Sequence, residues 1–153
     1  MSDRVIPMMN RREALALGAG VAAAVVAGWP VLALAEGEAD ALVQEFAGGK
    51  APETGRVHLD APEEAADGSA VQIAISVESP MTAEDHVASV LLIGEGNPVP
   101  KVAEFHFSPL SGSAQISLRI RLAKTQRVLA IAKMSDGSTF MDVKTVKVAA
   151  GGC

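Results

Sequence analysis

The side chain best suited to covalent chemistry in this sequence is the thiol of Cys153, the only cysteine and the last residue. Gly151 and Gly152 precede it. Two successive glycines accept backbone conformations closed to other residues and offer no side chain to pack, so we expect this end of the chain to move freely. A thiolate can hold sulfur reversibly as a disulfide-like adduct, which serine or lysine cannot do. The pattern predicts a flexible arm, residues 149–153, that reaches roughly 17 Å when extended.

The other polar residues give little support for a catalytic or metal site. The three histidines, His58, His86 and His106, are scattered and lack metal-ligand spacing, so we interpret them as surface residues. The acidic pairs Glu63-Glu64 and Glu84-Asp85 fall in expected loops without a partner for acid–base chemistry. We therefore predict no catalytic residue, no cofactor-binding residue and no metal ligand.

Charge excludes one class of partner and leaves a second open. The formal net charge is −5, and no basic footprint for nucleic acid is present. Arg119 and Arg121 share one face of an expected strand, with Lys124 close by. These cations could attract an anionic substrate or an acidic patch of a partner, although a solvated or subunit-contact face is the favoured interpretation.

The N-terminus indicates export. Paired arginines in Asn10-Arg11-Arg12 precede an almost uncharged run over 14–34, and Ala33-Leu34-Ala35 offers small residues to a signal peptidase. The run approaches the length of a membrane span, but it is rich in glycine and is broken by Pro30. We therefore predict a twin-arginine signal peptide over residues 1–35, cleavage after Ala35 and a periplasmic location.

Segment 36–54 predicts one short amphipathic helix followed by a linker. Its apolar residues recur at helical spacing, at Ala39, Leu42, Val43 and Phe46. Three acidic residues fall in the expected first turn: Glu36, Glu38 and Asp40. Gly48 and Gly49 mark the expected end.

From residue 55 to residue 148 the pattern changes to that of strands. Apolar residues alternate with small or polar ones over 71–77 and 115–122, as in half-buried strands. Turn signals between such segments indicate about seven strands, which predicts an all-β, immunoglobulin-like antiparallel β-sandwich in architecture alone. The segment 128–132 is apolar throughout, so both of its faces should be covered. A partner protein and a central position in the sheet explain this equally well.

Several motifs together resemble one family. They are the twin-arginine leader, Phe105-His106-Phe107, the segment 119–126, Ser135-Asp136-Gly137-Ser138 and the terminal Gly151-Gly152-Cys153. They are similar to SoxY, the sulfur-carrier subunit of the periplasmic thiosulfate-oxidising Sox system. The likeness covers essentially the whole chain, and the terminal arm is its most specific motif.

The resemblance implies a role for the arm and a set of partners. It implies an immunoglobulin-like carrier that forms a heterodimer with SoxZ and bears its substrate covalently on the arm cysteine. A SoxA-SoxX cytochrome would join thiosulfate oxidatively to the thiol, SoxB would release sulfate, and SoxC-SoxD would oxidise the remaining sulfur. On this chain, only Cys153 maps onto the attachment residue, with Gly151 and Gly152 as its hinge.

The chain departs from the family pattern at its end, because the family's arm has two more glycines after the cysteine. A terminal carboxylate on Cys153 should disfavour the thiolate and repel anionic thiosulfate. Either the sequence is truncated, which we expect, or the arm is tuned differently.

Two other functions compete with the carrier. One is an exported, non-catalytic β-sandwich interaction module whose tail cysteine forms intermolecular disulfides. The other is a thiol enzyme such as a peroxidase or sulfurtransferase, which needs a base or cation beside the thiol that the arm itself does not supply.

Overall fold

The computed structural model describes residues 32–151, with side chains from Gly37 onward; residues 1–31 and 152–153 lie outside it. Most of the predicted signal peptide, and both Gly152 and Cys153, therefore fall outside the described residues. In chain order, the elements are helix α2 (Leu32–Phe46), strands β1 (Val57–Asp60), β2 (Glu64–Asp67), β3 (Val71–Val77), β4 (Val87–Gly94) and β5 (Lys101–His106), the 3-10 turn η1 (Pro109–Ser111), and strands β6 (Ala114–Ile120), β7 (Gln126–Met134) and β8 (Thr139–Ala150).

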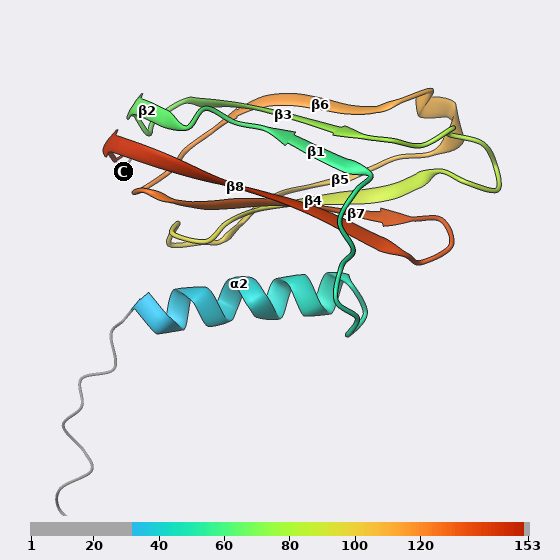
Figure 1. Cartoon of the computed structure of the whole chain (residues 1–153), viewed down its shortest axis with the longest axis horizontal. Coiled ribbons are helices and arrows are strands. Elements are labelled where there is room, and N and C mark those ends of the chain that lie inside the picture. The colour runs from blue at the N-terminus through green and yellow to red at the C-terminus, as the bar shows by residue number, and fades with distance from the viewer. Residues whose placement is uncertain (1–31, 152–153) are drawn as a thin grey trace, which may run out of the picture. The chain divides into compact units, whose positions relative to one another are not determined.

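The described strands form two sheets packed face to face (Figure 1). The smaller sheet has the order β1-β3-β6, and the larger has the order β2-β8-β7-β4-β5. All neighbours are antiparallel except β2 and β8. The predicted all-β sandwich is confirmed, with eight strands among the described residues where about seven were expected. The short strand β2 reads EAAD and has no alternation of apolar and polar residues, so its pattern gave no strand signal.

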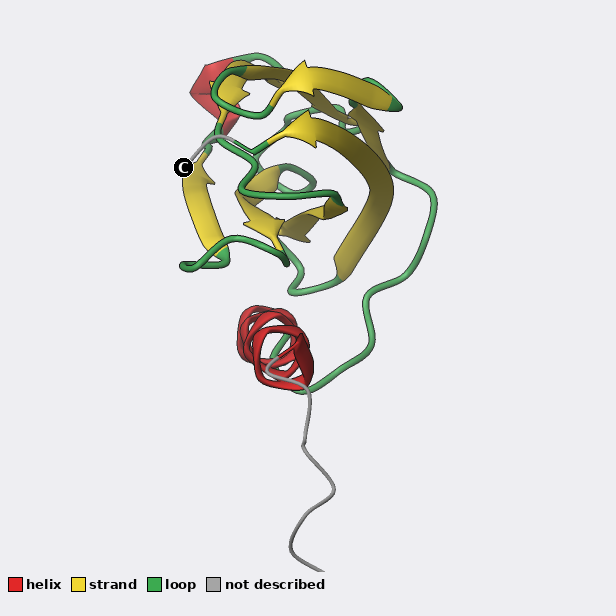
Figure 2. Cartoon of the chain, turned by 90° about the vertical axis from the view of Figure 1, so that its left-hand side faces the viewer, coloured by secondary structure: helices red, strands yellow, loops and turns green. Residues whose placement is uncertain are grey.

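The apolar segment 128–132 of strand β7 is covered on both faces by the chain itself. Its side chains alternate between two cores: Val128 and Ala130 lie between the sheets, while Leu129 and Ile131 face α2. The helix covers the outer face of the larger sheet, as the end view in Figure 2 shows. Full burial of one such Leu or Ile side chain is worth about 1.5–3 kcal/mol. Of the two explanations for segment 128–132, the central position in the sheet therefore holds.

Helix α2 packs by the face that its sequence predicts. The apolar residues at helical spacing, Ala39, Leu42, Val43 and Phe46, contact the outer face of the larger sheet. The helix ends where two glycines adopt positive φ, +65° at Gly48 and +81° at Gly49, a conformation that residues with side chains rarely take. The predicted end of the helix is thus correct.

The start of α2 differs from the expectation. The helix begins at Leu32, so Glu36, Glu38 and Asp40 do not occupy its first turn. Leucine and alanine are strong helix formers, and the segment 32–35 therefore extends the helix backward. Within the described residues, no helix combines the length and hydropathy needed to cross a membrane.

The last strand continues beyond the predicted boundary at residue 148. Strand β8 extends to Ala150, which pairs in register with Asp67 of β2, and the N–H of Gly68 donates to the Ala150 carbonyl at 2.7 Å. Ala149 and Ala150 are therefore strand residues and not part of a free arm. This corrects the start of the arm from residue 149 to Gly151, because the edge strand β2 supplies hydrogen-bonding partners that the sequence did not reveal.

Candidate functional site

The end of β8 meets the β2–β3 turn and the β6–β7 loop at one end of the sandwich (Figure 1). The N–H of Val148 donates to the hydroxyl of Thr125 at 2.9 Å, and the N–H of Leu122 donates to the Gly68 carbonyl at 2.8 Å. We call this region, made up of Gly68, Ala123, Thr125, Ala150 and Gly151, the arm base. It holds the point from which the predicted arm leaves the fold.

Gly151 lies so close to the β6–β7 loop that no side chain fits there. A Cβ atom on Gly151 would overlap the carbonyl oxygen of Ala123. Glycine is required at such a position because the two backbones approach closely, whatever its dihedral angles. The hinge role of Gly151 and Gly152 stays a prediction, but the structure supplies a steric reason for glycine at the first of the two.

A network of side-chain amides fastens the β6–β7 loop. The Oδ1 atom of Asn97 accepts from the Ala123 N–H at 3.0 Å, and its Nδ2 donates to the Arg121 carbonyl at 2.9 Å. Gln126 is only 7% exposed; its Nε2 donates to Asn97 Oδ1 at 2.9 Å, and its Oε1 accepts from the Gly96 N–H at 2.8 Å. A satisfied buried network of this kind rigidifies the groups it joins. It therefore holds Ala123 in position beneath Gly151.

Sequence reasoning assigned Asn97 no role beyond a turn. Nothing in the local pattern places the Asn97 amide beside residues that lie more than twenty positions later in the chain. Gln126 was noticed only as part of a family-like motif. Its contacts supply the physical reason why a glutamine suits that position.

Charges at this end of the sandwich fall into paired and unpaired groups. The carboxylate of Glu95 is buried and accepts two hydrogen bonds from Arg127, at 2.6 and 2.7 Å. Within residues 37–151, by contrast, Arg121 and Lys124 are exposed and make no ion pair or side-chain hydrogen bond. The N–H and the hydroxyl of Ser69 both donate to the Asp67 carboxylate. These two hydrogen bonds, of which the one from the N–H has the larger effect, lower the pKa of Asp67. Asp67 is thus an anion at neutral pH.

The three histidines do not form a site. His58 Nε2 lies 2.9 Å from a Glu78 oxygen, the ring of His86 contacts the Thr82 carbonyl at 3.0 Å, and His106 lies 3.7 Å from a Glu104 oxygen. All three lie on the surface. The described part of the chain contains no group of three or more His, Cys, Asp or Glu residues that could hold a metal ion.

The acidic pairs are also surface features. Glu64 forms an exposed ion pair with Lys147 at 3.4 Å, and Asp85 forms one with Arg56 at 3.3 Å. Glu64 lies in β2 and not in a loop, which corrects the expectation for the first pair. Exposed pairs of this kind are worth about 0–1 kcal/mol and suggest no chemistry.

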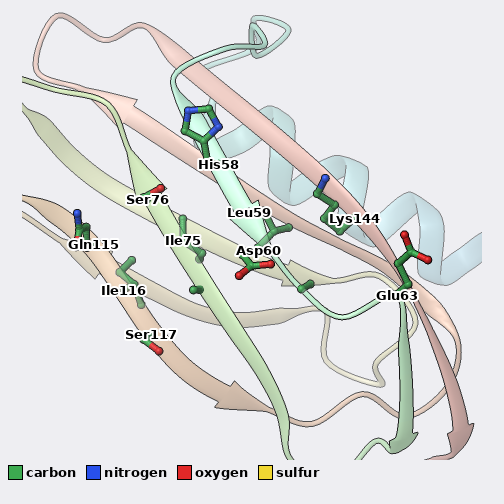
Figure 3. Close-up of a pocket in the computed structure, with 12 residues that line it drawn as sticks. His58, Leu59, Asp60, Glu63, Ile75, Ser76, Gln115, Ile116, Ser117 and Lys144 are labelled. Carbon is green, nitrogen blue, oxygen red and sulfur yellow. The ribbon is translucent and has the colours of Figure 1, made fainter.

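A groove of about 570 Å³ lies along the smaller sheet (Figure 3). Its lining includes His58 and Asp60 from β1, Ser76 from β3, Ser117 from β6 and Lys144 from β8. In the described structure no hydrogen bond joins the histidine to a hydroxyl or to Asp60, so the groove holds no paired nucleophile and base. The arm base therefore remains the best-supported candidate site.

Comparison with known proteins finds one family over most of the chain. The family model for the sulfur oxidation protein SoxY matches residues 43–153, which include the terminal Gly-Gly-Cys. Among curated proteins, none matches the sequence significantly.

Solved structures share the fold. The sulfur carrier protein SoxY from Chlorobium limicola f thiosulfatophilum is similar with a TM-score of 0.63 and 25% identity, over 76% of this chain and 96% of that chain. A superoxide reductase (neelaredoxin) from Ignicoccus hospitalis has a TM-score of 0.55 and 24% identity, over 67% of this chain and 89% of that chain. A variant of that reductase gives 0.56 and 22%, over 68% and 90%. The two reductase structures show likeness of fold alone.

Proposed function

Because this chain belongs to the SoxY family of sulfur oxidation proteins, we propose that it carries sulfur intermediates covalently on the Cys153 thiol and presents them to partner enzymes. Membership of the family supports a sulfur-carrier role. The observation that carries the finer proposal is that the family match runs through the terminal cysteine, next to a strand end that is held firmly by its neighbours.

The proposed chemistry balances in two steps. In the first, the thiol and thiosulfate form a sulfur–sulfur bond: Cys–SH + S₂O₃²⁻ gives Cys–S–S–SO₃⁻, one proton and two electrons. We propose the SoxA-SoxX cytochrome as the electron acceptor. In the second, water attacks the terminal sulfur in SoxB: Cys–S–S–SO₃⁻ + H₂O gives Cys–S–SH, SO₄²⁻ and one proton. SoxC-SoxD would then oxidise the sulfane sulfur that remains.

The position of the histidines favours a carrier over a thiol enzyme. A catalytic thiol needs a neighbouring base. His58 pairs in register with Ser76 and His106 with Ser89, towards the end of the strands opposite the arm base, and His86 contacts Thr82. The described histidines thus lie away from the start of the arm and supply no base there.

The direct test is the intact mass of the protein from cells grown on thiosulfate. We expect added mass that reductant removes and that maps to the Cys153 peptide, at the values for sulfane or thiosulfonate sulfur. We expect the same spectrum to show a chain that begins at Glu36, the product of the proposed cleavage after Ala35 on export to the periplasm. A free thiol, or only a disulfide to another protein, would instead support the interaction module.

We also propose that the chain pairs with SoxZ, by the side of the sandwich between β5 and β6. These are edge strands of the two sheets, joined through η1, whereas the opposite edge strand β1 packs against β8 and β7. Several apolar residues on this side are only half-buried: Val102, Phe105, Phe107, Ile116 and Leu118. Leu110 in η1 is 97% exposed. Apolar side chains at open edges are typical of surfaces that a partner covers.

Leu110→Glu should therefore weaken pairing with SoxZ at least tenfold and leave the isolated chain as stable as before, because Leu110 is almost fully exposed. Val99→Glu is the matched control, since Val99 is 69% exposed but lies at the other end of β5. Titration of each variant with SoxZ measures the effect. Equal affinity for both variants would place the interface elsewhere.

A further inference from the structure

We propose that Arg121 and Lys124 form an anion cradle at the arm base, which receives the terminal sulfonate of the adduct carried on Cys153. The inference rests on the proposed function and adds a noncovalent binding site for the cargo. Nothing in the carrier chemistry itself requires such a site, since the covalent bond already retains the sulfur.

The two cations are carried by the loop that meets the start of the predicted arm. Arg121 and Lys124 flank Ala123, whose carbonyl oxygen lies against Gly151 at the start of the arm. Two more residues, when extended, span about 7 Å. Extended arginine and lysine side chains are about as long as this. An adduct on Cys153 could therefore meet cations carried by the residues next to Ala123.

The positive charge of both cations is available to an anion. Arg127 is engaged with the buried Glu95, whereas Arg121 and Lys124 make no ion pair or side-chain hydrogen bond within residues 37–151. Arg119, two residues before Arg121, donates to Gln72 at 3.3 Å. Asp67, beside Ala150 in the sheet, is an anion of this region, and hydrogen bonds from Ser69 lower its pKa. Arg121 and Lys124 together carry more charge than this carboxylate, which favours an anion near them.

Hydrogen bonds hold the backbone that carries both cations. The Arg121 carbonyl is held by Asn97, and the Lys124 carbonyl accepts from Gln126 Nε2 at 3.2 Å. The Lys124 side chain lies over Gly96, where a Cβ atom would come within 2.8 Å of its Cε. Both cations thus project from a backbone that is already ordered, and less conformational entropy is lost when they bind a sulfonate.

The test uses tetrathionate, which builds the proposed adduct without any partner enzyme: Cys–S⁻ + S₄O₆²⁻ gives Cys–S–S–SO₃⁻ and S₂O₃²⁻. In the full chain carrying Arg121→Gln and Lys124→Gln, we expect the second-order rate with tetrathionate to fall about fivefold at low salt. The rate with neutral 4,4′-dithiodipyridine should stay within twofold, and it reports any change in the thiolate fraction. High salt should remove most of the difference.

Lys50→Gln is the matched control, since it removes one exposed cation at the opposite end of β8. That end is marked by the hydrogen bond from Glu53 N–H to the Thr139 carbonyl, 2.8 Å. The proposal is overturned if the double variant keeps the parent rate, if both reagents slow equally, or if Lys50→Gln slows tetrathionate as much. None of these results depends on the mass of the protein from cells, which tests the carrier function separately.

Discussion

Cys153→Ser is expected to abolish thiosulfate-dependent sulfur oxidation, lowering turnover in the reconstituted system by more than about a hundredfold. A serine hydroxyl cannot form the sulfur–sulfur bond that holds the cargo, and it is almost never ionised near neutral pH. The sandwich ends at Ala150, so the free energy of unfolding and the affinity for SoxZ should stay at the parent values. Turnover, urea unfolding and pairing are the three measurements.

A second variant separates the thiol from its place on the arm. Thr54→Cys in the Cys153→Ser background restores an exposed thiol, but before β1 instead of after β8. We expect no recovery of turnover, because a thiol in that position cannot enter the partners' clefts. Sulfur oxidation retained by Cys153→Ser alone would refute the carrier proposal and favour the interaction module.

Gln126→Leu is expected to lower the free energy of unfolding by about 1–3 kcal/mol and to loosen the arm base. The leucine has a similar volume but leaves the Gly96 N–H without its acceptor and removes the amide that holds Asn97. Urea unfolding should show a lower midpoint with an unchanged slope. Amide hydrogen exchange at Ala123, whose N–H donates to Asn97, should become faster.

Gln115→Leu provides the comparison for that substitution. It makes the same chemical change on an exposed position of β6, where the effect on stability should stay within about 0.5 kcal/mol. If Gln126→Leu proved as stable as Gln115→Leu, or if exchange at Ala123 did not change, the network would not be what fastens the loop.

Periodic patterns explain where sequence reasoning succeeded. In α2, β3 and β6, the apolar residues recur at the spacing that brings them to one face of the helix or strand. A few consecutive residues therefore contain the whole pattern that predicts each element. Strand β7 is apolar throughout, because neighbouring residues face two different cores. Its burial could be predicted, but the identity of the covering element could not.

Long-range pairing explains where it failed. Strand β2 has no apolar alternation, and it forms because β8 lies beside it. The same contact keeps Ala149 and Ala150 in the sheet and moves the start of the arm to Gly151. The roles of Asn97 and Gln126 likewise depend on contacts between residues about thirty positions apart. Such contacts leave no local signature.

By itself, the sequence determined the class of the fold and predicted where the chemistry takes place. A single thiol after two glycines indicates the covalent chemistry available to the chain, and hydrophobic periodicity indicates its helices and strands. Both can be predicted because they depend on the type and order of neighbouring residues. Only the tertiary structure decided that the last strand continues to Ala150 and that Gly151 lies against the β6–β7 loop. These depend on strand pairing between distant segments, whose energy is set by the whole assembly of two sheets and a helix.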